Sequence, residues 1–544
     1  MGRSVRQERT AGSTSRRDAQ RARWRSDGWY PGLTLGQACV AAAEAVADAP
    51  LTFARRDGEH THRRGELHER ARRVASGLLE AGVSPGARVV VQSPATARST
   101  VVLEALWLLG AVPVPVVAAA GQAEVRHIVE RCGAETIVVP GAGSDLLLRA
   151  RQLGLPRVVV VDGEEQGAGA GQLSLDGLEA HEPLAELPPV DPASVACVIY
   201  TSGSTAAPKG VLHSHETLLA GYEPPGSAPT IPVLMTFPSG HIASVLGMVR
   251  PLTAGGSTVV MDRWSPSRAV ELVEAHRIVS SAGTPFYLST LLDEAERTGG
   301  DISSLSLFLV GAASVPPALV ERAERAGILT WRTYGSTEHP AITSGVPTDP
   351  VERRIATDGR PGPGNEVRIV DDAGQDLPVG AEGEILARGP RQFLGYDDPE
   401  LDEASFTGDS WFRTGDVGRL DDEGHLTITD RKKDVIIRGG ENVSAKAVED
   451  VLATHAAVAE VAVCAGPDPV WGERVCAFVR TRPGRDVTLD ELRRHVLDAG
   501  LATHHAPEQL EVTDDLPRTA TGKVRKADLR ARLRASCDHP QPQP

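Results

Sequence analysis

The sequence predicts an α/β fold in which a large N-terminal domain precedes a small α+β C-terminal domain. Short β-branched runs alternate with segments of helical periodicity from residue 67 to residue 326. Between residues 359 and 430 the runs are shorter and are separated by Gly and Asp, which is typical of antiparallel structure. After residue 430 the chain returns to a mixture of helices and strands, enough for a separate compact unit.

The first part of the chain predicts βαβ units. Apolar residues recur at helical spacing from Leu67 to Leu79, and Gly82 ends that helix. Strands are expected at 89–91, 112–117, 137–139 and 158–161, with helices at 100–109, 124–131 and 145–151. Such alternation favours a mainly parallel sheet with helices on its faces. Residues 163–189 are rich in Gly, Ala, Glu and Pro and predict a long surface connection.

The alternation of strands and helices resumes after this connection. Strands are predicted at 195–200, 233–237, 257–261, 278–281 and 305–310, with helices at 266–276 and 316–326. In the C-terminal unit, helices are predicted at 445–453, 489–499 and 524–533, and strands at 458–465 and 474–480. The sequence therefore predicts two βαβ stretches, then an antiparallel region and a separate small α+β unit.

The composition is that of an acidic globular protein. With 72 acidic and 57 basic residues, the net charge of −15 argues against a nucleic-acid partner or an anionic membrane surface. The apolar run 105–120 is too short to cross a bilayer and contains prolines, so no transmembrane segment is expected. Six cysteines without a CxxC pair favour a reducing cytoplasm over a disulfide framework or a zinc site. The Arg-rich residues 1–28 and residues 536–544 are expected to be disordered tails.

A loop rich in hydroxyl groups leaves the strand that ends at Tyr200. It begins Thr201-Ser202-Gly203-Ser204-Thr205 and leads to Lys209. Hydroxyl and backbone N–H groups can surround phosphate oxygens, and a lysine adds positive charge. The Gly-Lys-Ser/Thr order of a Walker A loop is absent. By itself the segment is either an anion cradle or a flexible Ser/Gly turn.

Three later loops combine aromatic, acidic and basic groups. Tyr334-Gly335-Ser336-Thr337-Glu338 offers a ring for stacking on a base and a carboxylate for Mg²⁺. Asp416, on a tight turn before the charged run 430–434, suits the hydroxyls of a ribose. Residues 517–523 form a turn with Lys523 at its tip. Taken singly, each loop is also compatible with a solvated turn or charge cluster.

Taken together, these loops resemble those of the adenylate-forming superfamily, which includes acyl-CoA synthetases, adenylation domains and beetle luciferases. The match rests on TSGST…PKG, YGSTE, TGD, DRKKD…GGEN and PRTATGK in this order, and it extends from about residue 29 to residue 533. The resemblance implies that residues 29–430 form two doubly wound βαβ subdomains plus a small β-barrel-like subdomain. It also implies that residues 431–535 form a mobile lid domain that carries the catalytic lysine.

The resemblance implies a site for ATP. The residues that would hold it are Thr201, Ser202, Gly203, Ser204, Thr205, Lys209, Gly311, Ala312, Ala313, Tyr334, Gly335, Ser336, Thr337, Asp416 and Arg431. Tyr334 would stack on adenine and Thr337 would contact the α-phosphate. Glu338 would bind Mg²⁺, and Asp416 and Arg431 would hold the ribose. One departure, Ala206 in place of a common glycine, leaves the path of the phosphate loop open.

The resemblance also implies sites for the acid and the thiol. His241 matches a gate at an acyl pocket that Ile242, Val245 and Gly311 would line, whereas Lys433 matches the hinge. Gly439 and Gly440 lie where a pantetheine arm would enter. Lys523 matches the catalytic lysine, which would act together with Glu338, Thr201 and His241.

Two features of the predicted pocket bear on the acid. Residues 231–248 contain no Asp or Glu to pair with a substrate ammonium, which argues against an amino acid. Ile242 stands where 2-hydroxyaryl acid enzymes usually carry Asn. An apolar pocket, built from Ile242, Val245, Leu246 and Met248, instead suits a medium-chain, alicyclic or simple aromatic acid. The alternative is that some of these residues belong to the core side of a helix.

The implied reaction activates a small-molecule carboxylic acid with ATP and Mg²⁺ through an acyl-adenylate and then transfers the acyl group to CoA. One alternative is transfer to the phosphopantetheine of an acyl carrier protein. Another is a pseudoenzyme that binds an adenosine nucleotide without catalysis. The joint presence of Lys209, Glu338, Asp416 and Lys523 weighs against the pseudoenzyme.

Overall fold

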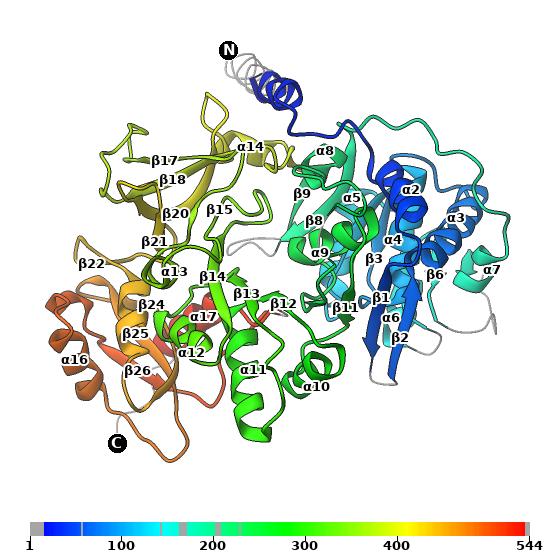
Figure 1. Cartoon of the computed structure of the whole chain (residues 1–544). Coiled ribbons are helices and arrows are strands. Elements are labelled where there is room, and N and C mark those ends of the chain that lie inside the picture. Colours follow the sequence, from blue (N-terminus) through cyan, green and yellow to red (C-terminus); the bar gives the residue numbers. More distant parts are fainter. Residues whose placement is uncertain are drawn as a thin grey trace, which may run out of the picture.

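The computed structural model describes residues 16–55, 58–141, 144–162, 171–201, 208–227, 230–519 and 521–538. Figure 1 shows the blue and cyan N-terminal part on one side, the green part in the middle and the orange C-terminal part on the opposite side. The yellow strands lie above the C-terminal part. The fold class predicted from the sequence is confirmed, since parallel sheets covered by helices precede antiparallel strands and a small α+β domain.

A nine-stranded sheet runs through the large domain. Its strands, in spatial order, are β16 (Arg360–Pro361), β15 (Thr343–Ser344), β14 (Leu329–Tyr334), β13 (Leu307–Gly311), β12 (Ser280–Gly283), β10 (Val233–Met235), β11 (Thr258–Met261), β1 (Pro50–Arg55) and β2 (Gly58–Arg63). The strands from β14 to β1 are parallel, and antiparallel strands extend both edges. The hairpin of β1 and β2 was not predicted from the sequence.

A second, all-parallel sheet has five strands. They are, in order, β4 (Val112–Pro115), β3 (Arg88–Val91), β5 (Thr136–Val139), β6 (Arg157–Val160) and β7 (Gln172–Ser174). Its helices are α4 (Ala97–Leu109), α5 (Gln122–Cys132), α6 (Asp145–Arg151) and α7 (Leu175–Glu179). The predicted surface connection 163–189 thus contains a short strand and a short helix, which add to this sheet.

The two sheets sandwich one layer of helices. That layer consists of α2 (Leu35–Ala45), α3 (Arg64–Glu80), α4 and α9 (Ile242–Thr253), which share the largest hydrophobic core. The alternation of side chains along a strand decides which core each residue joins. Val89 and Val91 face this middle layer, whereas Val90 faces the outer layer of α5 and α6.

The opposite face of the nine-stranded sheet has its own helical cover. It consists of α10 (Pro266–His276), α11 (Pro285–Thr298) and α12 (Pro317–Arg325), next to the short α13 (Val351–Ala356). Ser265 and Thr284 are the N-cap residues of α10 and α11, and each is followed by proline at the first helical position. This pair of residue types favours the start of a helix at that point. The predicted helix 266–276 is confirmed.

Two antiparallel sheets complete the large domain. The smaller contains β19 (Gly395–Tyr396), β9 (Lys209–Ser214) and β8 (Val195–Thr201), with α8 (His215–Leu218) after β9. The larger contains β17 (Glu366–Val370), β18 (Gly383–Arg388), β20 (Phe412–Leu420) and β21 (Leu426–Arg431), with α14 (Glu400–Ser405) nearby. This confirms the antiparallel structure predicted between residues 359 and 430.

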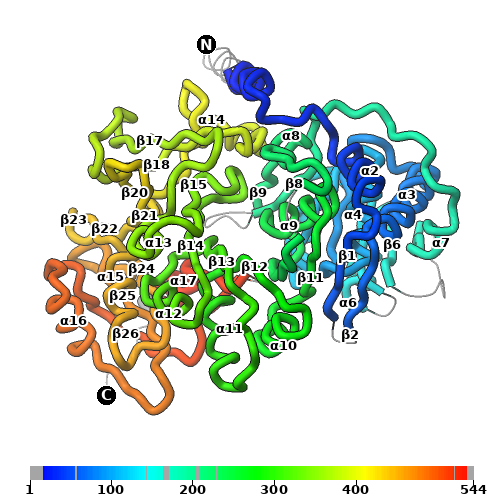
Figure 2. Tube along the Cα trace, in the orientation of Figure 1, coloured from blue at the N-terminus to red at the C-terminus, as the bar shows by residue number. Residues whose placement is uncertain are grey.

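The C-terminal domain forms around an antiparallel sheet with one added parallel strand. The strands are β23 (Glu441–Val443), β22 (Ile436–Arg438), β25 (Gly472–Thr481), β24 (Val458–Asp468) and, beside β25, β26 (Gln509–Val512). The helices are α15 (Ala445–Leu452), α16 (Leu489–Asp498), α17 (Lys526–Asp538) and a 3₁₀ turn at Thr503–His505. Figure 2 draws this orange-to-red domain against the green α11 and α12 region.

The N-terminal segment corrects the sequence analysis. Residues 16–26 form a helix, although residues 1–28 were predicted to be disordered. The side chain of Trp24 packs with Tyr30 and Ala220, and Arg17 forms a 2.9 Å ion pair with Asp402. The helix therefore depends on contacts with distant residues, which the apolar periodicity of the segment itself does not show. At the other end α17 extends to Asp538, into the predicted tail 536–544.

Within the part of the chain that the structure describes, none of the helices combines the length and the apolar character of a membrane span.

Candidate active site

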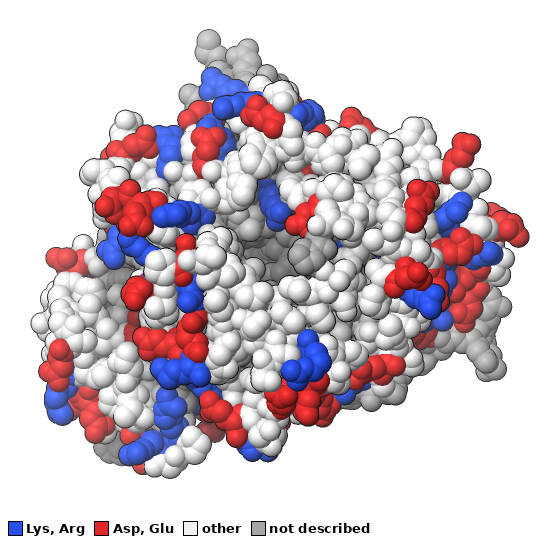
Figure 3. All heavy atoms as spheres, in the orientation of Figure 1, with Lys and Arg blue, Asp and Glu red and all other residues white. Residues whose placement is uncertain are grey.

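The sequence-distant loops meet beside the carboxyl ends of β13 and β14. Parallel neighbours end at the same sheet edge, so the residues after Gly311 and after Tyr334 lie together. In the space-filling view this face of the molecule is hollowed near its middle, where Figure 1 draws β13, β14 and β9 (Figure 3). Most atoms around the hollow belong to uncharged residues, and charged side chains of both signs lie at its upper edge.

Asp416 connects two of the predicted nucleotide residues. Its Oδ2 accepts a 2.7 Å hydrogen bond from the Tyr334 hydroxyl, and its Oδ1 pairs with Nε of Arg431 at 2.6 Å. The β20–β21 register places Asp416 directly opposite Arg431. Asp416 is 3% exposed, and its charge raises the pKa of the Arg431 guanidinium. Burial raises the pKa of Tyr334, so the phenol stays protonated and donates to the carboxylate.

Lys523, which belongs to the C-terminal domain, lies close enough to Arg431 and Asp416 for their charges to interact. The positive charge of Arg431, followed by burial, lowers the pKa of Lys523 from 10.5 to about 8. Asp416 and Asp434 act in the opposite direction. A lysine at this position is thus surrounded by both signs of charge and by little water, an environment typical of functional sites.

His241 lies close enough to Lys523 for their charges to interact. Burial, with a smaller contribution from Lys523, lowers the pKa of His241 to about 4, so its ring is neutral near pH 7. The Nδ1 atom accepts the Ala243 N–H at 3.1 Å, which leaves the ring hydrogen on Nε2. The ring stacks on Phe237 at 5.4 Å between centroids. His241 therefore presents a fixed N–H donor.

Glu338 and Thr337 are held by residues that the sequence analysis did not single out. The Tyr396 hydroxyl donates to Oε1 of Glu338 at 2.8 Å. Buried His213 donates from Nε2 to the Thr337 carbonyl at 2.8 Å. Both holders come from the small β19–β9–β8 sheet, so this sheet orients the segment after β14.

The same small sheet carries the start of the phosphate loop. Thr201 pairs with Lys209 across the β8–β9 hairpin, and the Lys209 ammonium lies 5.4 Å from the centre of the Tyr396 ring. The Asp397 carboxylate accepts the Gly210 N–H at 3.1 Å and the Tyr200 hydroxyl. Asp397 therefore ties both ends of the loop together. The predicted Ser202, Gly203, Ser204 and Thr205 lie outside the described residues.

The segment at the end of β13 is constrained by close contacts. A methyl group at Gly311 would lie 2.6 Å from the Thr333 carbonyl oxygen, so only glycine fits beside β14. Ala312 adopts φ 64°, a left-handed conformation that is costly for a residue with a side chain. Ala313, which follows it, is partly exposed. Such strain at a predicted site is consistent with a functional constraint on the backbone.

The structure does not place the predicted acyl-pocket side chains Ile242 and Val245 in an open pocket. Both lie in the largest hydrophobic core, at 5% and 4% exposure. Together with Val249 and Leu252 they form a helical stripe on α9, which packs against α2. The α9 residues that remain partly exposed include Ala243 and Leu246. Both side chains therefore pack in the core in this structure, and their part in an acyl pocket stays a prediction.

The predicted hinge and thiol residues lie between the domains and on the small domain. Burial lowers the pKa of Lys433, which follows β21. Gly439 and Gly440 form the left-handed turn between β22 and β23. Gly439 lies against Trp471, where a methyl group would come within 2.6 Å of the indole. Trp471 is itself 46% exposed, which gives this turn an open apolar neighbour.

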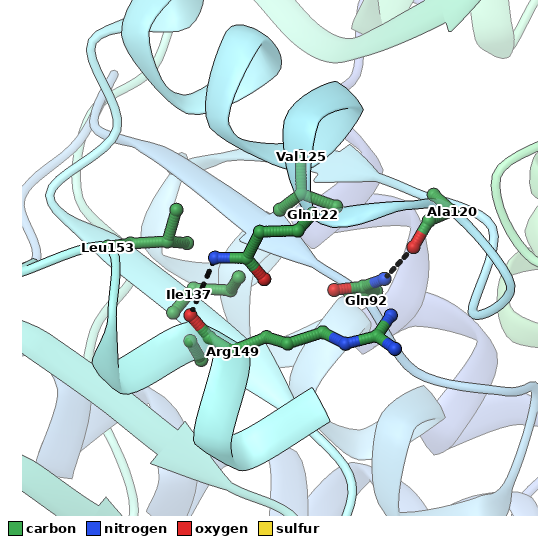
Figure 4. Close-up of a pocket in the computed structure, with 8 residues that line it drawn as sticks. Gln92, Ala120, Gln122, Val125, Ile137, Arg149 and Leu153 are labelled. Carbon is green, nitrogen blue, oxygen red and sulfur yellow. Dashed lines mark hydrogen bonds between the residues drawn. The ribbon is translucent and has the colours of Figure 1, made fainter. Parts of the chain in front are cut away.

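A second hollow, in the five-stranded subdomain, is too small to be the substrate-binding site. Figure 4 shows Gln92, Gln122, Val125 and Arg149 around it, within the five-stranded subdomain. Its empty volume is about 180 Å³. Ligand pockets usually exceed 300 Å³, and none of the predicted site residues lines this hollow.

The described residues contain no group of three His, Cys, Asp or Glu that could hold a metal ion by itself. Mg²⁺ is typically bound by one or two carboxylates together with substrate phosphates and water. The half-buried Glu338 carboxylate, fixed at one oxygen by Tyr396 and near the start of the phosphate loop, fits such a shared site.

Comparison with protein-family models decides the family. The AMP-binding enzyme model matches residues 40–397, and the model of the AMP-binding enzyme C-terminal domain matches residues 447–523. The chain belongs to the AMP-binding enzyme family. The resemblance inferred from the loops is therefore confirmed.

Relatives of this AMP-binding enzyme span nearly its whole length. The medium-chain fatty-acid–CoA ligase of Escherichia coli strain K12 is 32% identical over 94% of this chain and 93% of its own. The 2,3-dihydroxybenzoate-AMP ligase of Bacillus subtilis strain 168 is 33% identical over 86% of this chain and 88% of its own. The structure of o-succinylbenzoate CoA synthetase from Bacillus subtilis, in complex with an acyl-adenylate intermediate, aligns with a TM-score of 0.78. That alignment has 25% identity and covers 91% of this chain and 97% of the other.

Sequence reasoning missed the residues that support the site. Tyr396 and Asp397 follow a glycine in Leu394-Gly395-Tyr396-Asp397, and a tyrosine beside an acid after glycine is a signal that the motif search could have used. His213 carries no such signal, because its role depends on the tertiary position of the Thr337 carbonyl.

Proposed function

We propose that this AMP-binding enzyme activates a carboxylic acid with an apolar body by forming an acyl-adenylate and then transfers the acyl group to the thiol of CoA. The observation that carries the proposal is the place of Lys523. Its charge interacts with Arg431, Asp416 and His241, although it belongs to the other domain. A single nucleotide and acid between these groups would contact both domains.

In the first half-reaction, a carboxylate oxygen of the acid attacks the α-phosphorus of ATP. A bond forms between that oxygen and phosphorus, the bond to the β-phosphate oxygen breaks, and pyrophosphate leaves with the electron pair. Thr201 and Lys209 would hold the phosphates, and Thr337 the α-phosphate. Asp416 and Arg431 would hold the ribose, with Tyr334 against adenine. Mg²⁺, held by Glu338 and the phosphates, would neutralise charge on the leaving group.

Lys523 and His241 would act on the attacking group. The Lys523 ammonium would bridge the carboxylate and the α-phosphate, where negative charge accumulates in the transition state. Neutral His241 can donate its Nε2–H to the acid without adding a second positive charge beside Lys523. The two groups would orient the nucleophile and keep it ionised.

In the second half-reaction, the thiolate sulfur attacks the acyl carbon. A carbon–sulfur bond forms, the carbon–oxygen bond to AMP breaks, and AMP leaves with the electron pair. We propose that the lid, residues 431–535, turns about Lys433 so that Gly439 and Gly440 face the cleft. The sheet topology supports a domain boundary near Lys433. Strand β21, which ends at Arg431, belongs to a sheet of the large domain, whereas β22, which begins at Ile436, belongs to the sheet of the small domain.

The acid is proposed to be fatty, alicyclic or aromatic. Phe237, Tyr287 and Trp264 form a continuous aromatic wall beside His241, with centroid distances of 6.2 Å and 4.4 Å between successive rings. Residues 231–248 carry no carboxylate for an ammonium group. One of the named relatives is a ligase of a medium-chain fatty acid, which is an acid of this kind.

The test is a panel of acids assayed for ATP–pyrophosphate exchange and then for thioester formation. We expect exchange with apolar acids and thioester formation when CoA is added. The variant Lys523→Ala should lower the exchange rate by about 10²–10³, the loss typical of one preorganised donor. If the enzyme catalyses exchange and transfers the acyl group to a carrier protein but not to CoA, the acceptor is the carrier protein. Binding of ATP without exchange for any acid would contradict the proposal.

The location is proposed to be the cytoplasm. The described cysteines, at positions 39, 132, 197, 464 and 476, are all buried free thiols. Cys464 and Cys476 lie opposite each other on β24 and β25 and remain reduced, which fits a reducing compartment.

A further inference from the structure

The turn that carries Lys523 rests on a residue of the large domain that has no part in the proposed chemistry. The turn is compact, because the Thr519 N–H donates to the Lys523 carbonyl and the Gly522 N–H donates to the Thr519 carbonyl. Gly522 adopts φ 81°, and its α-carbon faces the ring of Phe286 at the start of α11. A methyl group at Gly522 would lie 2.7 Å from Cδ1 and 3.1 Å from Cγ of that ring.

Arg518 makes a second contact with the same ring. Its guanidinium carbon lies 4.9 Å from the centre of the Phe286 ring, within the range of a cation–π interaction. The guanidinium also donates to the Gly522 carbonyl at 2.6 Å and pairs with Glu460 of β24 at 2.5 Å. Arg518 thus links the ring, the turn and the body of the small domain.

Phe286 itself is anchored in the large domain. It follows Thr284 and Pro285, which start α11, and its ring lies 6.1 Å from that of buried Tyr287. Tyr287 in turn stacks on Trp264. Phe286 is therefore a fixed surface, whereas the turn of residues 517–523 belongs to the domain that is proposed to move.

We propose that Phe286 is a positioning residue that holds the Lys523 turn in the orientation needed for adenylation. The inference rests on the proposed function, in which Lys523 is needed only in the first half-reaction. The contacts with Gly522 and Arg518 exist while Lys523 lies in the cleft, and any large rotation of the small domain breaks them. Loss of the ring should shift the population away from this orientation and slow adenylation, while the thiol step keeps its rate.

The variants Phe286→Ala, Phe286→Leu and Phe286→Tyr separate the possible contributions. Alanine removes the whole surface, leucine keeps apolar volume without a ring, and tyrosine keeps the ring. For Phe286→Ala we expect pyrophosphate exchange to fall about 5- to 30-fold, as for loss of one ring contact and one cation–π contact. Transfer from preformed acyl-adenylate to CoA, measured in a single turnover, should stay within about twofold. Phe286→Tyr should restore exchange, and Phe286→Leu should fall between the two.

A labelling experiment keeps the test independent of activity. The chain has six lysines, so acetylation of each can be followed by mass spectrometry. Lys523 should be acetylated several-fold faster in Phe286→Ala than in the parent or in Phe286→Tyr. Lys446, which pairs with Asp450 within the small domain, serves as the reference and should not change.

Several results would overturn the inference. One is unchanged exchange together with unchanged Lys523 labelling in Phe286→Ala. Another is an equal loss in both half-reactions with a lowered melting temperature, which would show a purely structural role. If the parent enzyme catalyses neither half-reaction with any acid, the proposed function fails, and the labelling result alone then decides whether Phe286 holds the turn.

Discussion

At the scale of single residues, the site depends on paired charges rather than on isolated motif members. Asp416 accepts from Tyr334 and pairs with Arg431, and Lys523 approaches the same group from the other domain. Each of these residues was predicted from the sequence. Their mutual contacts were not, because they lie on strands and turns that are far apart along the chain.

The lowered pKa of Lys523 predicts an alkaline limit. With a pKa of about 8, set first by Arg431 and then by burial, the free enzyme loses the ammonium as the pH rises through 8. The kcat/KM for ATP should therefore fall above about pH 8. Lys523→Arg should move that limit upward, because arginine stays charged. His241 stays neutral over this range because its pKa is about 4.

Stability should change in the opposite sense over the same range. Between pH 8 and 10.5 the unfolded chain binds a proton at Lys523 that the folded chain does not, so this group makes unfolding less favourable as the pH rises. The check is a pH series of kcat/KM and of denaturant unfolding for both proteins. An identical alkaline limit in Lys523→Arg would assign it to another group.

The buried Asp416 carboxylate predicts a binding defect rather than a chemical one. Asp416→Asn keeps the shape but removes the charge that faces Arg431 and the ribose. The Kd for AMP and the KM for ATP should rise about 10- to 100-fold, the loss of one charged hydrogen bond. The kcat should change little, because the ribose contact exists in both ground and transition states.

Calorimetry with AMP and steady-state kinetics check this prediction. Asp409→Asn is a matched control, since Asp409 lies just before β20 and its side chain is 61% exposed. It should bind AMP as the parent does. A collapsed kcat with an unaltered ATP KM in Asp416→Asn would contradict the ribose role.

At the scale of elements, the sequence predicted those strands best whose side chains are buried on both faces of the sheet. The runs that became β3, β5 and β6 consist of β-branched residues that need no partner to be recognised. The β1–β2 hairpin was missed, because most residues of β2 are polar and exposed. The Asp57-Gly58 dipeptide between these strands was an available hairpin signal.

The N-terminal helix shows why an element can escape prediction altogether. Its residues 16–26 carry few apolar side chains, and long-range pairs hold it in place. Arg17 pairs with Asp402, which also accepts the Tyr396 N–H at 2.9 Å, and Arg25 pairs with Glu216 at 2.5 Å. The helix therefore contacts α14 and α8, which lie next to the small sheet of β19, β9 and β8.

Removal of the Arg17 side chain should destabilise the folded chain. Arg17 and Asp402 are 7% and 13% exposed, so Arg17→Ala leaves a nearly buried carboxylate without its cation. The expected loss in the free energy of unfolding is about 2–4 kcal/mol. Arg23→Ala, which removes an exposed pair with Asp27 on the same helix, should cost less than about 0.5 kcal/mol. Denaturant melts of both variants check the difference, and equal losses would show that the Arg17 pair is not a specific anchor.

At the scale of the whole molecule, the hydrophobic cores separate the chain into the same two domains as the β-sheets do. The two hydrophobic clusters of the C-terminal domain contain only residues from 436 to 533. None of their members is shared with the cores of the large domain. A domain whose core is complete in this sense can move as a rigid body, as the proposed hinge at Lys433 requires.

This division predicts that a fragment of residues 432–538 folds by itself. Its β24–β25 hairpin, α15, α16 and α17 enclose both clusters without help from the large domain. The fragment should give dispersed amide resonances and one cooperative thermal transition. A random-coil spectrum would mean that contacts such as Phe286 with Gly522 are needed for folding and not only for orientation.

The sequence by itself determined the fold class and the family, and it predicted the residues that would touch ATP. These depend on local periodicity and on short loops whose residue types are dictated by phosphate, ribose and magnesium chemistry. Only the tertiary structure decided that Ile242 and Val245 pack in the core and that residues 16–26 are helical. It also decided that Tyr396 binds Glu338, that Asp397 binds Gly210, and that Phe286 contacts Gly522. The physical reason is that burial and support arise from contacts between segments distant in the chain, and no local pattern encodes such contacts.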